Sequence, residues 1–68
     1  MARYYVNRNA QANGDHEVHK EGCAWMPEPH NRDPLGEHSS CHTAVYQAKL
    51  KYPTADGCKH RSPECHTR

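Results

Sequence analysis

The sequence is short of the large apolar side chains from which a hydrophobic core is normally built. It has no phenylalanine or isoleucine, and only three valines and two leucines among its 68 residues. A chain of this length forms at most one small domain, because it buries a limited fraction of its surface. Disordered chains of such low hydrophobicity usually carry a high net charge, whereas the formal charge here is +1. We therefore expect one folded domain, residues 1–68, held by a metal ion or by disulfides.

Long hydrophobic runs are also absent. The segment from Met1 to Asn7 contains no apolar stretch of the length found in signal peptides, and no later segment is suited to span a membrane. This predicts a cytoplasmic location and no membrane partner. In a reducing compartment the four cysteines stay available for metal or redox chemistry. Disulfides remain the alternative, since four cysteines can pair in three ways.

Catalytic motifs are missing as well. No Ser-His-Asp pattern, phosphate-binding loop or pair of acidic residues stands out, so we predict that the protein is not an enzyme. A redox enzyme would need a thiol pair of lowered pKa, and the nearest pair, Cys58 and Cys65, is poorly spaced for that role. The near-zero net charge also differs from the basic excess of dedicated nucleic-acid binders.

The N-terminal part of the chain predicts a β-hairpin. Residues 3–8 are rich in aromatic and β-branched types, which favour a strand. Asn13-Gly14 is a strong turn signal because both central residues of a type I′ turn have positive φ. Asp15 to His19 would form the return strand, with Glu17 and His19 on one face by the two-residue period.

The middle of the chain predicts a loop and then one helix, which makes the fold class α+β. Three prolines between residues 27 and 36 exclude a regular helix and favour an irregular loop, in which Leu35 is an anchor or the start of a very short strand. A helix over about 40–52 follows, capped by Ser39 or Ser40 and stopped by Pro53. Its apolar face is made of five residues at helical spacing: Cys41, Ala44, Val45, Ala48 and Tyr52.

Two clusters of cysteine and histidine are the candidate metal ligands of the sequence. His19 and Cys23 are separated by a turn containing Gly22, and Cys58 follows the turn signal Asp56-Gly57. Thiolate and imidazole are the ligands that tetrahedral zinc prefers, and short clusters on a long spacer are typical of zinc modules. We predict one zinc ion held by His19, Cys23, Cys58 and Cys65. His60 and His66 are the alternatives for the fourth ligand, because six residues separate Cys58 from Cys65.

The other chemically active side chains have ordinary interpretations. Cys41 lies on the apolar helix face and is expected to be a small core residue. Trp25 and Met26 are expected to cover the metal site and fill the core. The remaining histidines are expected to lie at the surface: His16, His30, His38 and His42.

Several of these residues resemble the Ada-type metal-binding module of bacterial DNA-repair methyl acceptors and nucleases. The residues that match are His19, Cys23, Asn31, Ser39, Ser40, Ala44 and Cys58. The chain also resembles short bacterial proteins that open with Tyr-Tyr-Val-Asn and carry Gly-Asp-His-Glu-Val-His, here residues 14–19. Two departures matter: Arg61 stands where the module has its last cysteine, and His19 stands where the methyl-accepting cysteine lies. Since an imidazole cannot replace a zinc-activated thiolate as alkyl acceptor, methyl-transfer repair is not expected.

These observations lead to two hypotheses of function. The first is a non-enzymatic structural or binding module in which zinc joins the hairpin to the helix, and whose surface recognises a protein or a nucleic acid. The basic residues available for a nucleic acid are Arg3, Arg8, Lys20, Lys49, Lys51, Lys59, Arg61 and Arg68. The second is a metal-free interaction domain that forms a homodimer, since a weak core favours burial of further apolar surface.

Overall fold

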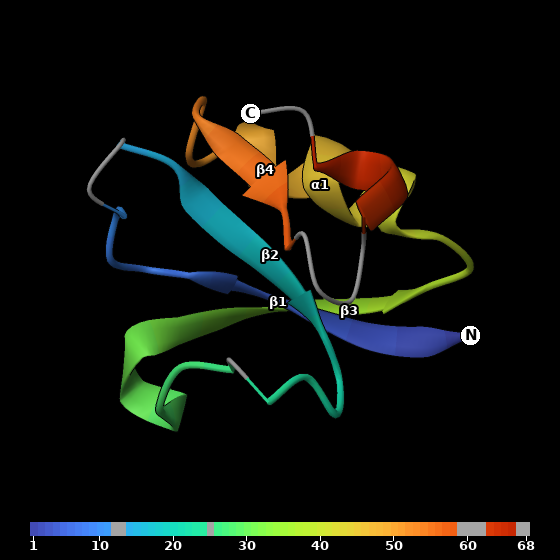
Figure 1. Cartoon of the computed structure of the whole chain (residues 1–68). Coiled ribbons are helices and arrows are strands. Elements are labelled where there is room, and N and C mark those ends of the chain that lie inside the picture. The colour runs from blue at the N-terminus through green and yellow to red at the C-terminus, as the bar shows by residue number, and fades with distance from the viewer. Residues whose placement is uncertain (12–13, 25, 59–62, 67–68) are drawn as a thin grey trace.

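A four-stranded sheet carries one helix on one of its faces (Figure 1). The structure, a computed structural model, describes residues 1–11, 14–24, 26–58 and 63–66. The spatial order of the strands is β3-β1-β2-β4. Along the chain the elements are β1 (Ala2–Asn7), β2 (His16–Lys20), a short 3-10 helix η1 (Pro29–Asn31), β3 (Arg32–His38), α1 (Cys41–Lys49), β4 (Ala55–Gly57) and a second 3-10 helix η2 (Pro63–Cys65). The α+β prediction is confirmed.

β1 and β2 pair as the predicted antiparallel hairpin. Val6 lies opposite Val18, and Tyr5 lies opposite His19. Because successive side chains of a strand point to opposite faces, these two pairs lie on opposite faces of the sheet. Val6 and Val18 belong to the buried apolar cluster under α1, so Tyr5 and His19 lie on the opposite face, which we call the outer face.

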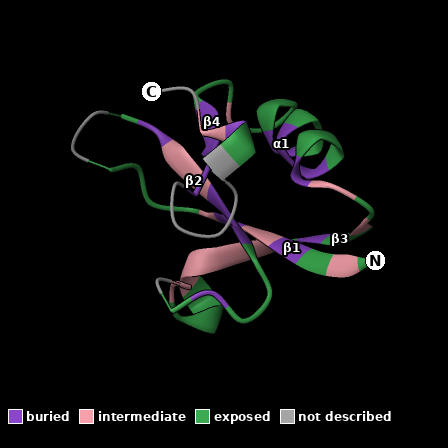
Figure 2. Cartoon of the chain, turned by 45° about the vertical axis from the view of Figure 1, so that its right-hand side comes forward, coloured by how far each residue is buried: buried purple, intermediate pink, exposed green. Residues whose placement is uncertain are grey.

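α1 covers the face of the sheet that carries Val6 and Val18. It does so with the residues that the helical period predicted. Cys41, Ala44, Val45 and Ala48 are all buried, and Figure 2 shows this buried side of α1 turned inward with exposed residues on its other side. The helix ends at Lys49, three residues before the predicted boundary. The apolar cluster is built largely from alanine, valine and cysteine, which leaves little apolar area with which to hold the fold.

The prediction of an irregular loop through residue 36 was wrong in its second half, because Arg32–His38 forms β3. The alternative of a short third strand at Leu35 is confirmed in kind, but the strand begins three residues earlier. β3 pairs antiparallel with β1 and is an edge strand of the sheet. An edge position tolerates Pro34, since only one side of the strand needs its backbone N–H groups. The register shifts between Tyr4 and Tyr5, and such an irregularity lets the proline be accommodated. Proline content therefore misled the sequence interpretation.

The predicted turn at Asp56-Gly57 is also corrected: these residues belong to β4, which pairs parallel with β2. Gly57 lies opposite Val18, and a Cβ atom added there would come within 2.6 Å of the Cys65 Cβ. Glycine is thus required for η2 to pack against β4. The N–H of Cys58 donates to the carbonyl of Val18 at 2.9 Å, which extends the ladder by one residue and brings Cys58 beside His19.

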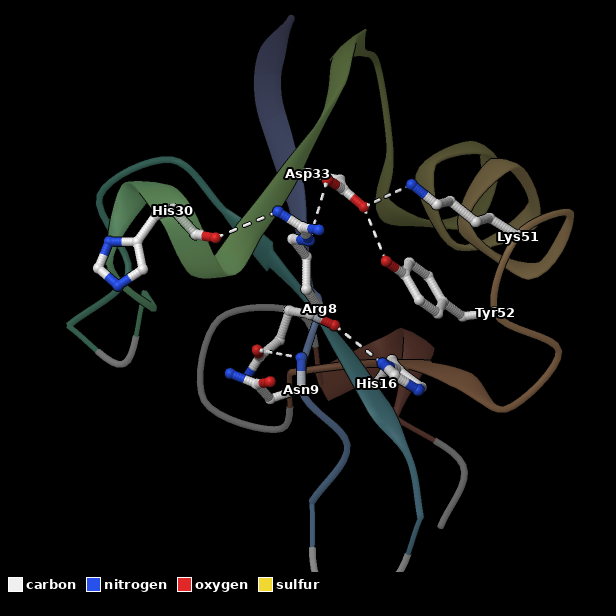
Figure 3. A network of polar contacts seen from close by, with 8 residues as sticks. Arg8, Asn9, His16, His30, Asp33, Lys51 and Tyr52 are labelled. Atoms are coloured by element: carbon white, nitrogen blue, oxygen red, sulfur yellow. Dashed lines mark hydrogen bonds and ion pairs between the residues drawn. The ribbon is translucent and has the colours of Figure 1, made fainter.

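A polar network joins β1 and β3 to the segment after α1 (Figure 3). The Asp33 carboxylate accepts hydrogen bonds from the Lys51 ammonium at 2.9 Å and from the Tyr52 hydroxyl at 2.8 Å, and Arg8 lies 3.7 Å away. The hydrogen bond from Lys51 is the main cause that lowers the pKa of Asp33 below its ordinary value. His16 is half-buried rather than fully at the surface, and its ring stacks on Tyr52 with centroids 4.3 Å apart.

Candidate metal centre

The candidate metal centre is formed by His19, Cys23 and Cys58, three residues from two distant parts of the chain. His19 lies near the end of β2, and a tight turn brings Cys23 back toward it. In that turn the N–H of Cys23 donates to the Lys20 carbonyl at 3.0 Å, and Gly22 takes a φ of 91° that disfavours other residues. Cys58 arrives from the neighbouring β4. The predicted grouping of these three residues agrees with their placement in the fold.

Two of the three separations between the donor atoms are close to the edges of a tetrahedral thiolate–imidazole site. The Cys23 and Cys58 Sγ atoms are 3.8 Å apart, and the Cys23 Sγ lies 3.4 Å from the His19 Nδ1. All three donors lie within 4.8 Å of one another. Zinc bonds of about 2.3 Å to sulfur and 2.0–2.1 Å to nitrogen place two sulfurs about 3.8 Å apart, and a sulfur and a nitrogen about 3.6 Å apart. One ion therefore fits between the three side chains.

The three side chains are almost inaccessible to solvent. His19 is 1% exposed, Cys23 5% and Cys58 0%, and both cysteines carry thiols instead of forming a disulfide. Burial lowers the pKa of His19, an effect that Glu17 partly opposes. Burial thus favours the neutral imidazole, which is the form that binds a metal.

The Glu17 carboxylate lies close to the ring nitrogen of His19 that does not face Cys23. The Glu17 Oε1 lies 3.5 Å from the His19 Nε2, the ring nitrogen that faces away from Cys23. A carboxylate at the far nitrogen of a histidine ligand fixes its tautomer and orientation in many metal sites. The sequence interpretation placed Glu17 and His19 on one strand face but did not assign a role to Glu17. The two-residue spacing between them was the available signal.

The structure does not bring Cys65, the predicted fourth ligand, to this group. Cys65 forms a disulfide with Cys41, with the two Cα atoms 6.3 Å apart, because η2 packs against the start of α1 and not against the outer face. Cys41 is the buried core residue that was predicted, although its disulfide was not.

Of the two alternative fourth ligands, the structure describes His66 but not His60. The His66 Nδ1 lies 3.0 Å from the Gly57 carbonyl and 3.4 Å from the Asp56 carboxylate, so its ring is engaged there. His60 lies outside the described residues, and its role stays a prediction from the sequence. Trp25, predicted to cover the site, also lies outside them, while Met26 is half-buried.

The remaining histidines can be placed in the described part of the chain. His30 and His42 are exposed, as expected. His38 is half-buried, and its two ring nitrogens contact the Thr43 hydroxyl at 3.0 Å and the Leu35 carbonyl at 2.8 Å. His38 therefore joins β3 to α1 and takes no part in the candidate metal centre.

No protein-family model matches this chain, and neither the curated proteins nor the solved structures give a match. The resemblance to the Ada-type module therefore stays a prediction from short motifs. Among the described residues, no helix is long and apolar enough to cross a membrane. The case for a function accordingly depends on the geometry of the candidate metal centre.

Proposed function

We propose that this protein is a small, non-enzymatic module that is held together by one zinc ion bound to His19, Cys23 and Cys58. The observation that carries the proposal is the match between the 3.8 and 3.4 Å donor separations and the edges of a tetrahedral zinc site. Bound there, the ion supplies a crosslink between the β1–β2 hairpin and β4. A crosslink of this kind compensates for the sparse apolar cluster under α1.

A structural role for the ion is favoured over a catalytic one. Catalytic zinc has three protein ligands and an open coordination position that substrate can reach, whereas structural zinc is enclosed by four protein ligands. No donor side chain of this centre is more than 5% exposed, and His60, which the sequence predicts as an alternative fourth ligand, would close the remaining position. The thiols of Cys23 and Cys58 favour a reducing compartment, whereas the Cys41–Cys65 disulfide favours an oxidising one. The cytoplasmic location therefore stays a prediction from the sequence.

We further propose that the partner is a protein. Tyr46 is 70% exposed and Leu50 74% exposed, and residues four apart lie on one side of a helix. Together they form an apolar contact surface on the solvent-exposed side of α1. Nucleic-acid binding is less well supported, because two of the basic residues named for it, Arg8 and Lys51, are paired with Asp33. Sedimentation at several concentrations distinguishes a second copy of the chain from a different protein partner.

Metal analysis tests the proposal. Protein purified without a histidine tag is analysed for metal by mass spectrometry, before and after treatment with a chelator, and an NMR amide spectrum is recorded each time. We expect one equivalent of zinc, and collapse of the dispersed spectrum when it is removed. A metal-free protein with a well-dispersed spectrum overturns the proposal and favours the metal-free homodimer.

A further inference from the structure

A second group of cysteine and histidine lies where α1 meets η2. Cys41 and His42 are the first two residues of α1, and Cys65 is the last residue of η2. Their donor atoms lie within 4.8 Å of one another, and the His42 Nδ1 is 3.4 Å from the Cys65 Sγ. The two sulfurs are joined as a disulfide. The group therefore has the same donor types as the candidate metal centre, in a different redox state.

We infer that reduction of the Cys41–Cys65 disulfide turns this group into a second metal site, with Cys41, His42 and Cys65 as ligands. Two thiolates and one imidazole form a donor set that suits zinc and related divalent cations. Cys41 is 2% exposed and Cys65 6% exposed, so the new thiolates are held close together by the packing of α1 and η2. His42 is exposed and approaches them from the solvent side.

A surface pocket gives access to this group. It has a volume of about 300 Å³, and His42, Glu64 and Cys65 are among the residues that line it. Cys65 thus borders the surface on the side of this pocket, although it is only 6% exposed, and the pocket is the route by which a reductant and an ion would approach. The Glu64 carboxylate adds negative charge to the pocket wall, and carboxylate oxygens are accepted zinc ligands. A water molecule or one of the two carboxylates that line the pocket, Asp56 or Glu64, would complete four-coordination.

The redox step needs a dithiol as reductant. A thiolate of the dithiol attacks the Cys65 Sγ, the Cys41–Cys65 bond breaks, and its electron pair leaves on Cys41 as a thiolate. The second thiolate of the reductant then displaces Cys65 from the mixed disulfide and closes the oxidised, cyclic product. The protein gains two electrons and two protons. Binding of a divalent ion to the two thiols releases those two protons.

The consequence is that α1 stays crosslinked to η2 in both redox states. Under oxidising conditions the disulfide makes the connection, and under reducing conditions the ion makes it. The second site lies on the α1 side of the sheet, whereas the candidate metal centre uses the outer face. The second site can therefore be filled or emptied while the candidate metal centre is intact, and the inference goes beyond the proposed function.

The inference is tested by titrating Co²⁺ into the protein without oxygen, before and after reduction with a phosphine. The phosphine takes its oxygen from water and leaves two protein thiols, and it does not compete for the metal as a dithiol does. Bound cobalt is followed by the visible absorption of tetrahedral Co²⁺ and by native mass spectrometry. We expect reduction to raise the number of free thiols by two and the number of bound ions by one. An unchanged number of ions, with all thiols reduced, overturns the inference.

Single substitutions test whether the additional ion is bound by the group of Cys41, His42 and Cys65. His42→Ala should weaken the second equivalent by at least the roughly tenfold to hundredfold typical of an outer-shell partner, and His30→Ala, which changes another exposed histidine, should have no effect. Cys65→Ser should abolish the second equivalent and keep the first. If Cys65→Ser instead weakens the first equivalent and reduction adds none, Cys65 belongs to the candidate metal centre and the inference is wrong. Failure of the proposed function is distinguishable, because it appears as no ion bound before reduction.

Discussion

The two Cys/His groups of this small protein contain the same kinds of side chain but differ in geometry. In the candidate metal centre the two sulfurs are 3.8 Å apart and both are thiols. In the group of Cys41, His42 and Cys65 the two sulfurs are covalently joined. A separation of 3.8 Å is far too long for a disulfide and suits two ligands of one ion. Donor identity alone therefore does not decide between a metal and a disulfide.

The surroundings of the two groups explain the difference. His19 and Cys58 are held side by side by the parallel pairing of β2 with β4, and the Glu17 carboxylate lies 3.5 Å from the His19 Nε2. Backbone hydrogen bonds thus fix the spacing of the donors. Among the described residues no backbone hydrogen bond joins α1, which carries Cys41, to η2, which carries Cys65, and here the disulfide itself links the two elements.

The largest effect is expected from Cys58→Ser, which removes one thiolate from the candidate metal centre. Structural zinc contributes roughly 10–16 kcal/mol of apparent binding free energy in zinc-finger peptides, about as much as the whole stability of a domain. We expect Cys58→Ser to bind no zinc and to lose its folded state, as measured by circular dichroism and NMR. A folded variant with the wild-type melting temperature would contradict the account.

Cys41→Ser is the matched change in the other group and should have a smaller effect. The disulfide closes a loop with a sequence separation of 24 residues, for which loop-closure entropy predicts a stabilisation of about 3–4 kcal/mol. We expect a loss of that order in the free energy of unfolding, from urea titration without reductant, and one equivalent of zinc still bound. Loss of the zinc together with the disulfide would show that the two groups are not independent.

Glu17→Gln separates orientation of a ligand from ligation itself. The variant keeps all three donors but removes the carboxylate charge beside His19. Outer-shell partners of this kind contribute roughly tenfold to hundredfold in metal affinity, and we expect a loss in that range in competition with a chromophoric chelator. Glu21→Gln, at an exposed position one residue beyond β2, is the control. Equal affinity of the two variants would show that Glu17 plays no part in orienting the ligand.

The smallest effect is expected from Asp33→Asn, which lies away from both groups. The Lys51 and Tyr52 hydrogen bonds hold the pKa of Asp33 below its ordinary value of 3.8. A lowered carboxyl pKa contributes stability that is present above that value and is lost as the pH falls through the lower, folded-state pKa. Because the ion pairs are partly exposed, we expect Asp33→Asn to cost about 1 kcal/mol or less at neutral pH. The difference from wild type, measured by urea titration, should shrink in acid; a constant difference at every pH would contradict this interpretation.

The parts of the fold with a long periodic signal could be predicted from the sequence, and the short parts could not. The helix could be predicted from the spacing of Cys41, Ala44, Val45 and Ala48, and the hairpin from the strand-forming residues on either side of Asn13-Gly14. Asn13 of that predicted turn lies outside the described residues. β4 has three residues and therefore no detectable period; only its pairing with β2 defines it. β3 was missed because Pro34 indicates a loop unless the strand is known to lie at an edge.

The candidate metal centre could likewise be predicted only in part from the sequence. His19, Cys23 and Cys58 could be grouped because zinc modules use short clusters on a long spacer. The placement of Cys65 could not be predicted, since it depends on the packing of η2 against Gly57 and α1. Short sequence distance from Cys58 did not imply spatial proximity to its sulfur. The role of Glu17 required the orientation of a ring, which spacing alone does not provide.

The most direct measurement is X-ray absorption at the zinc edge of the unreduced protein, which counts the atoms bound to the ion and their distances. The account predicts two sulfur ligands at about 2.3 Å and lighter ligands, including one imidazole, at about 2.0–2.1 Å. A shell of three sulfurs would bring a further cysteine into the centre, and a shell of only oxygen and nitrogen would place the ion elsewhere. The first result would contradict the pairing of Cys41 with Cys65 as a disulfide, and the second would contradict the assignment of His19, Cys23 and Cys58.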